Sequence, residues 1–153
     1  MIVKIRSDIV SFGEYVQNFC KNKYPQHSSG CPNYGKKNGC PPCELIDSVL
    51  DFEKDIYLIY TEFNIGEFAQ KMRVRFPGWS ERQCFNSRLW QGKARKEHNL
   101  ELERFREKFH LDIVLQPERK GVDINLLFIR LGMKLEWPPR KIARVVSLGG
   151  TLV

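Results

Sequence analysis

The sequence predicts one small α/β domain over residues 1–153, with a short central sheet flanked by helices. A chain of 153 residues can bury a single hydrophobic core, and its 42% hydrophobic and 28% charged residues are close to the globular average. The segment DIYLIYTEF, residues 55–63, is apolar at its centre and rich in β-branched and aromatic residues, which is typical of a strand covered on both faces. We expect strands near 56–63, 111–115 and 142–148, with helices packed against them.

The N-terminal segment predicts a short strand or arm followed by a helix. Residues 1–6 alternate in hydrophobicity, and Ser11-Phe-Gly-Glu14 matches the capping box that opens a helix. Phe12, Val16, Phe19 and Cys20 then follow at helical spacing and should form a core-facing stripe. Cys20 should therefore end this helix and face inward, either as a metal ligand or as an ordinary buried cysteine.

Residues 20–43, CKNKYPQHSSGCPNYGKKNGCPPC, contain four of the five cysteines. Gly, Pro, Asn and Ser dominate this segment and no apolar period runs through it, which predicts a long loop. Such a loop cannot bury a core of its own, so something other than hydrophobic packing must hold it. A helix should follow from Glu44 to about Asp51 with Cys43 at its start, where the helix dipole favours a thiolate.

Two helices with polar caps should follow the central strand. Asn64 is placed to cap a short helix that Pro77-Gly78 ends. Ser80-Glu-Arg-Gln83 is a second capping box, and it opens a helix that we expect to run unbroken to Lys108. Cys84 and His98 lie on the buried face of that helix, and we expect His98 to be a core histidine and not a ligand.

The C-terminal part should alternate between strand and helix. The pattern predicts a strand at 111–115, a turn at 117–121, a helix at about 122–131 and a last strand at 142–148. Trp137-Pro138-Pro139 breaks regular structure before that last strand. No internal repeat or low-complexity segment is evident, so nothing divides the chain into further domains.

The cysteine pattern predicts a metal centre. Cys20, Cys31, Cys40 and Cys43 supply the four thiolates that a tetrahedral zinc site or a [4Fe–4S] cluster needs. The spacing matches neither a zinc ribbon, which has two CxxC knuckles, nor the closely spaced ferredoxin run, so it leaves the metal open. A thioredoxin-like role for Cys40-Pro-Pro-Cys43 is disfavoured because a polar loop precedes it. Walker A, GxGxxG, HExxH and GxSxG motifs are absent, and enzymatic activity is left undecided.

A resemblance to a known protein family also supports the metal-binding interpretation. Cys31-Pro-Asn-Tyr-Gly-Lys36, followed by Gly39-Cys40-Pro-Pro42 and the strand at 55–63, resembles a domain-of-unknown-function family of predicted metal-binding proteins from archaea and anaerobic bacteria. The hallmark of that family is a CPxYGK box followed by CPP. Gly121-Val-Asp-Ile124 is similar to a second segment of the family. The resemblance implies metal binding.

The same resemblance bears on the ligand set. It implies Cys31 and Cys40 as ligands, and family members usually have further cysteines in the middle of the chain, where this chain has only Cys84. The predicted set is therefore Cys20, Cys31, Cys40 and Cys43, or a set in which Cys84 replaces Cys20 or Cys43.

The positive charge of the chain suggests an acidic partner. With 25 Lys and Arg against 18 Asp and Glu, the formal net charge is +7, and nucleic acid is the commonest acidic partner of such proteins. An ordinary solvated surface also explains this composition. Phosphate contacts would come from the helix at 80–108 and from the arginines of the segment Trp137 to Arg144, with Trp90 or Trp137 available for stacking. The candidate nucleic-acid residues are Arg88, Trp90, Lys93, Arg95, Lys96, Arg140, Lys141 and Arg144.

Two functions are therefore predicted. The first is a metal-binding protein with a cysteine-ligated [4Fe–4S] cluster for redox or sulfur chemistry, working with a redox partner protein. The alternative is a basic RNA- or ribosome-associated module, binding RNA or a ribonucleoprotein, with a structural zinc site made of four cysteines. The longest apolar run, residues 56–60, is too short to cross a bilayer and the N-terminus lacks a secretory apolar stretch. We therefore expect a cytoplasmic protein without membrane association.

Overall fold

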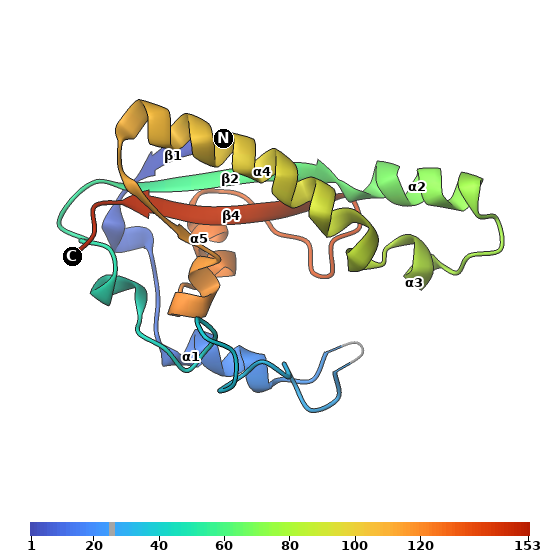
Figure 1. Cartoon of the computed structure of the whole chain (residues 1–153), viewed down its shortest axis with the longest axis horizontal. Helices are drawn as coiled ribbons and strands as arrows, with labels where there is room; N and C mark the ends of the chain where they lie inside the picture. The colour runs from blue at the N-terminus through green and yellow to red at the C-terminus, as the bar shows by residue number, and fades with distance from the viewer. Residues whose placement is uncertain (25–26) are drawn as a thin grey trace.

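The structure, a computed structural model, describes residues 1–24 and 27–153 and confirms a single small α/β domain built on a four-stranded antiparallel sheet (Figure 1). The strand order is β1-β2-β4-β3, so the two long strands lie at the centre. The strands are β1 (Ile2–Ile5), β2 (Ile56–Asn64), β3 (Asp112–Leu115) and β4 (Ile142–Gly150). Each predicted strand is therefore present, and the N-terminal segment is a strand and not a free arm.

The two long central strands pair along their whole length, whereas the edge strand β3 covers only part of β4. The β2–β4 register runs from Tyr57 opposite Gly149 to Asn64 opposite Ile142. In contrast, β3 pairs only with Ser147–Gly150. Within the described residues, the Ile142–Val146 half of β4 therefore has no partner strand on the side away from β2.

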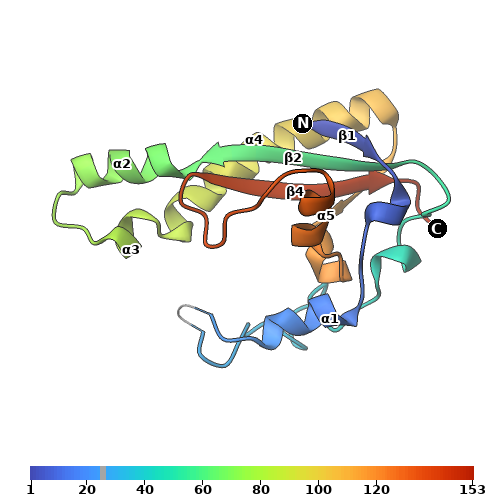
Figure 2. The same ribbon diagram turned by 180° about the vertical axis from the view of Figure 1, so that it is seen from behind.

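Helices cover both faces of the sheet. The long helix α4 (Ser87–Phe109) crosses one face and α5 (Ile124–Arg130) lies on the other, while the short α1 (Glu14–Gln17) lies farther from the sheet, beyond α5 (Figures 1 and 2). The alternation of side chains along β2 follows this arrangement, because Leu58 packs with the α5 side and Ile59 with the α4 side. The prediction that this strand is covered on both faces is confirmed.

Polar caps set the boundaries of the helices after β2 largely as predicted. The side chain of Asn64 accepts a hydrogen bond from the Glu67 amide at 2.9 Å and begins α2 (Ile65–Arg75). Ser80 and Gln83 form the full capping box at the start of α3 (Glu81–Cys84). These caps could be recognised in the sequence because each satisfies backbone N–H groups within one turn of itself.

The predicted unbroken helix from residue 80 to residue 108 is wrong. The helix α3 ends at Cys84, and a new helix begins where the Asn86 side chain accepts a hydrogen bond from the Arg88 amide at 3.1 Å. Asparagine competes with the helical backbone for hydrogen bonds and so favours a cap over a helix interior. The break places Cys84 and the α4 residues on two separate helices.

The predicted helix from Glu44 to Asp51 is also wrong. Only a 3₁₀ turn, Ile46–Ser48, is present, so Cys43 does not begin an α-helix. The backbone of this segment pairs with the C-terminal residues instead: the Asp51 amide donates to the Thr151 carbonyl at 2.8 Å. Long-range pairing outweighs helix formation here because so short a helix is marginal by itself.

The first helix is shorter than predicted. The Ser11 capping box does not form, because α1 begins after Gly13 without a side-chain cap. It continues as a 3₁₀ turn, Asn18–Lys21, and Phe19 is 56% exposed. Further 3₁₀ turns span Ser7–Ile9 and Pro117–Lys120. The C-terminal helix α5 is confirmed, with the Asp123 side chain as its cap.

Candidate functional site

The cysteine clasp, as we name residues 20–43, is held by backbone hydrogen bonds and not by a core. The Cys31 amide donates to the Cys20 carbonyl at 2.7 Å, and the Gly35 amide donates to the Pro41 carbonyl at 2.7 Å. No α-helix or β-strand lies between Lys21 and Ile46 in the described part of the chain. Pro25 and Gln26 of the predicted loop lie outside the described residues. The clasp is thus a set of linked turns.

A glycine makes the central contact of the clasp possible. Gly30 has a φ of +84°, and a Cβ at this position would lie 2.7 Å from the Cys20 carbonyl oxygen and 2.7 Å from that of Lys21. Only glycine combines a positive φ with so close an approach to another backbone. Gly30 therefore allows the chain at Cys31 to lie directly against the chain at Cys20.

Cys31 lies beside Cys20 in the clasp, and Cys40 is close enough for its charge to affect the Cys20 thiol. Cys20, Cys31 and Cys40 are half-buried. Burial raises the pKa of the Cys20 thiol most, negative charge at Cys31, Cys40 and Glu118 raises that pKa further, and Arg119 lowers it. Charge effects of this kind require the thiols to lie near one another. The structure therefore joins Cys20 and Cys31 directly, whereas among the described residues no hydrogen bond links Cys40 to either of them.

The fourth predicted ligand, Cys43, has other partners. Its thiol donates a hydrogen bond to the Arg119 carbonyl at 3.2 Å, and the Gln17 amide group donates to its sulfur at 3.6 Å. Gln17 is buried and also donates to the Cys43 carbonyl at 3.0 Å and to the Arg119 carbonyl at 2.9 Å. Gln17 thus ties Cys43 to the turn at Pro117–Lys120. The sequence showed no sign of this role.

Cys84 lies apart from the clasp. It is fully buried at the end of α3, which packs against α2, whereas the clasp lies next to α1 (Figures 1 and 2). Its predicted place on a buried face is confirmed, but the structure does not bring it to the other cysteines.

The arrangement of the clasp bears directly on metal binding. Among residues 1–24 and 27–153, no group of three or more His, Cys, Asp and Glu side chains is placed to hold a metal ion. Ligation by the thiols of Cys20, Cys31 and Cys40 would therefore have to draw them closer together. Turns without helix or strand can make such a change, and metal binding commonly completes the folding of a site in this way.

The predicted nucleic-acid residues on α4 divide into exposed and buried ones. Arg88, Arg95 and Lys96 are exposed, and the Lys93 ammonium lies 5.5 Å from the centre of the Phe68 ring. Trp90 is only 8% exposed, and its indole N–H donates to the Phe85 carbonyl at 3.2 Å. The expectation that Trp90 offers its ring for stacking is therefore corrected, because the side chain belongs to the core.

Some of the predicted nucleic-acid residues before and within β4 already have partners inside the protein. Arg144 donates to Glu62 at 2.7 Å, so its charge is already paired. The Arg140 guanidinium lies 4.5 Å from the centre of the Phe85 ring, and Lys141 is exposed. Trp137, by contrast, is 91% exposed and is available to a ligand.

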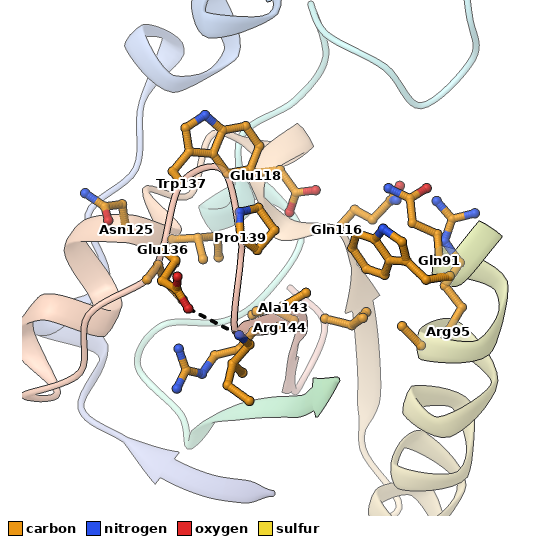
Figure 3. Close-up of a pocket in the computed structure, with 17 residues that line it drawn as sticks. Gln91, Arg95, Gln116, Glu118, Asn125, Glu136, Trp137, Pro139, Ala143 and Arg144 are labelled. Atoms are coloured by element: carbon orange, nitrogen blue, oxygen red, sulfur yellow. Dashed lines mark hydrogen bonds between the residues drawn. The ribbon is translucent and has the colours of Figure 1, made fainter. Parts of the chain in front are cut away.

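A pocket of about 480 Å³ lies beside the half of β4 that β3 leaves unpaired (Figure 3). One wall is α4 and the other is the 135–139 segment, while β4 forms the floor. No sequence motif marked this pocket, because its residues come from five separate segments. Its lining residues include Gln91, Ala94, Arg95, Gln116, Glu118, Asn125, Glu136, Trp137, Ala143 and Val145.

Two carboxyl groups, Glu118 and Glu136, line this pocket. Glu118 is exposed, but nearby protein atoms raise the pKa of its carboxyl by desolvation, while its own backbone N–H and Arg119 act in the opposite direction. Glu136, on the other wall, has its pKa lowered chiefly because its carboxylate accepts a hydrogen bond from the Ile142 amide at 3.2 Å. Glu118 is thus the free carboxyl of the pocket and Glu136 is a structural one.

His98 is the core histidine that the sequence predicted. It is 3% exposed, its Nε2 lies 2.8 Å from Ser147 Oγ, and its Nδ1 lies 3.1 Å from Thr61 Oγ1. Burial lowers the pKa of the imidazole. Because Ser147 is also buried, this Ser–His pair has no access to a substrate.

Comparison with protein-family models, curated proteins and solved structures gave no match for this chain. The resemblance to the CPxYGK family therefore stays a prediction. Among the described residues, no helix combines the length and the apolar character that crossing a membrane requires.

Proposed function

We propose that the protein binds an iron–sulfur cluster through Cys20, Cys31 and Cys40. The observation that supports this proposal most is the backbone contact between Cys20 and Cys31, together with the effect of charge at Cys31 and Cys40 on the Cys20 thiol. Thiolates are the ligands of iron–sulfur clusters, and clusters are held by a small number of cysteines that converge on one point. The clasp lacks a core of its own, so a cluster would also stabilise it.

The partners of Cys43 favour three protein ligands over four. Its thiol is engaged by the Arg119 carbonyl and by Gln17, and releasing it would leave the buried Gln17 amide with fewer partners. A metal site with one position open to substrate is typical of chemistry, whereas a closed four-ligand site is typical of a structural metal. We therefore favour redox or sulfur chemistry, with a redox partner protein, over a purely structural centre.

Metal analysis of the untagged full-length protein tests this proposal. We expect iron and acid-labile sulfide after anaerobic purification or reconstitution, together with visible charge-transfer absorption. Each of the substitutions Cys20→Ser, Cys31→Ser and Cys40→Ser should abolish that absorption. A colourless protein with stoichiometric zinc would contradict the cluster and support the alternative structural site.

Two matched variants decide the number of ligands. Cys43→Ser keeps a hydroxyl donor for the Arg119 carbonyl, and Cys84→Ala changes only the buried α3 position. Both variants should retain the cluster if three cysteines ligate it. Loss of the cluster in Cys43→Ser would instead indicate a four-cysteine site.

The second candidate is a basic RNA- or ribosome-associated module with a structural zinc site made of four cysteines. Its support is the exposed face of α4, where Arg88, Arg95 and Lys96 have no ion-pair partner within the part of the chain that is described. Binding through such side chains must weaken as salt is added, because it releases counterions from the phosphates. A filter-binding assay with RNA at increasing salt would test this candidate.

A further inference from the structure

The pocket beside β4 has the construction of a ligand site. It is open because β3 ends its pairing at Ser147 and the chain turns away at Gln116, which has a left-handed backbone with φ of +50°. Its volume of about 480 Å³ is within the range of small-molecule sites in proteins. Within the described chain none of the cysteines lines this pocket, although its Glu118 belongs to the turn that Gln17 and Cys43 contact through the Arg119 carbonyl.

The walls and the floor of the pocket suit a flat ring. Its apolar lining includes Ala94 on the α4 wall and Ala143 and Val145 on the β4 floor. Trp137 lies on the loop side of the pocket and is 91% exposed, while Gln91 and Arg95 lie on the α4 side (Figure 3). An exposed tryptophan beside an apolar floor is an arrangement on which bases stack, because every base has a π-face.

The polar groups of the pocket suit the edge of a nucleobase. Glu118 lies between the two walls in Figure 3, and Gln91, Gln116 and Asn125 add three carboxamides. A carboxamide offers both donors and acceptors, and a carboxylate accepts from the amino group of a base. In the described chain, the Glu118 carboxylate has no ion-pair partner that would compete with such a donor.

The α4 side of the pocket carries positive charge that could contact a phosphate attached to the base. Arg95 lines the pocket, and no ion-pair partner for it is present among the described residues. Lys96 and Arg88 are exposed on the same helix. The net charge of +7 favours the approach of an anionic ligand over a cationic one.

We infer that this pocket binds a nucleobase with an amino group, carried by a free nucleotide or by single-stranded RNA. Trp137 stacks on the base, Glu118 accepts from its amino group, and Arg95 contacts the phosphate. Cytosine, adenine and guanine carry an exocyclic amino group, whereas uracil does not. The pocket should therefore discriminate against uracil.

The observations favour a base over an extended peptide added to the free edge of β4. Only Ile142–Val146 is unpaired, and the Ile142 amide is already bound by the Glu136 carboxylate at 3.2 Å. So short an edge offers few of the main-chain hydrogen bonds that give strand addition its affinity.

Calorimetric titration of the full-length protein tests the inference. The probes are CMP, AMP, GMP and UMP, with ribose 5-phosphate as the ligand without a base. We expect at least one amino-bearing nucleotide to bind about tenfold or more tightly than UMP and ribose 5-phosphate, because neither of these has an amino group that can donate a hydrogen bond to the Glu118 carboxylate. Equal binding of ribose 5-phosphate would overturn the inference.

Variants separate the pocket from the rest of the surface. Glu118→Gln and Trp137→Ala should each weaken the preferred nucleotide about tenfold. Glu107→Gln, on an exposed part of α4, and Trp79→Ala, outside the pocket, are matched controls that should bind as the wild type does. Unchanged binding in both pocket variants, or binding of unrelated extended peptides that nucleotides do not displace, would also overturn the inference.

A competition experiment with oligonucleotides distinguishes a free nucleotide from single-stranded RNA as the source of the base. A cytidine, adenosine or guanosine oligonucleotide that competes with the preferred nucleotide and loses affinity in Trp137→Ala identifies single-stranded RNA as the ligand. A mononucleotide that binds while the oligonucleotides do not identifies the free nucleotide. Oligonucleotide binding that is unaffected by both pocket variants places RNA elsewhere on the surface and counts against the pocket.

Discussion

The helix α4 and the cysteine clasp are segments of comparable length with opposite burial. α4 buries Trp90, Ala94, His98, Leu102 and Phe105 against the sheet. Among the described residues of the clasp, only Gly30 and Pro41 are buried. The position of α4 is therefore set by apolar area removed from water, whereas the clasp depends on turns and a few backbone hydrogen bonds. The clasp can therefore rearrange around a ligand with little effect on the free energy that holds α4 against the sheet.

The largest expected effect is at the centre of the α4 interface. Phe105→Ala should lower the free energy of unfolding by about 3–5 kcal/mol, because it removes a fully buried ring that contacts Tyr57 and Phe109. Urea denaturation measures the loss. Leu100→Ala on the same helix is the control, since Leu100 is 54% exposed and should change stability by no more than about 0.5 kcal/mol. Similar losses in both variants would show that burial on α4 does not set its stability.

The next effect is a pH dependence that belongs to α4 and not to the clasp. The pKa of His98 is lowered in the folded protein by burial, and the N-terminal ammonium lowers it further while Glu101 opposes this. Below the unfolded pKa of about 6.5, the unfolded chain binds a proton that the folded chain does not. Stability should therefore fall as the pH drops below about 6.5, by at most about 1.4 kcal/mol per pH unit, and should stop falling below the folded pKa.

His98→Gln identifies the group responsible for this slope. In the variant, the free energy of unfolding should depend less on pH between the folded and unfolded pKa values, because up to one fewer proton binds on unfolding. Thermal or urea unfolding at several pH values measures this change. His110→Gln, at an exposed position after α4, is the matched control and should keep the slope. A slope that is unchanged in His98→Gln would assign the pH dependence to other groups.

The smallest effect on global stability is expected in the clasp. Alanine at a positive φ carries strain of about 1–2 kcal/mol. Gly30→Ala adds a collision with the Cys20 carbonyl, whereas Gly39→Ala has a similar φ of +79° and meets nothing within 4 Å. Because the clasp can open without the sheet, Gly30→Ala should lower the global free energy of unfolding by less than about 1 kcal/mol.

Hydrogen exchange separates these two glycine variants. Exchange of the Cys31 amide should become faster in Gly30→Ala, because the bond to the Cys20 carbonyl is weakened, and should stay unchanged in Gly39→Ala. Equal protection of Cys31 in both variants would mean that the close approach at Gly30 does not hold the two cysteines together.

The features that could be predicted from sequence are those whose causes lie close together in the chain. The apolar run of β2 and the caps at Asn64 and Ser80 each act within a few residues, and the structure confirms them. The break at Asn86 was missed because the apolar period continues across it. The absence of a helix after Cys43 was missed because the backbone there pairs with residues near the C-terminus.

By itself, the sequence determined the α/β class, the buried strand at 56–64, the core position of His98 and the presence of four cysteines in one turn-rich segment. Only the tertiary structure decided which cysteines are neighbours, because the contact at Gly30 and the hydrogen bonds of Cys43 join segments far apart in the chain. It also decided the pocket, since that depends on where β3 stops pairing with β4. Local patterns carry information about elements, whereas sites arise from long-range contacts that no local pattern contains.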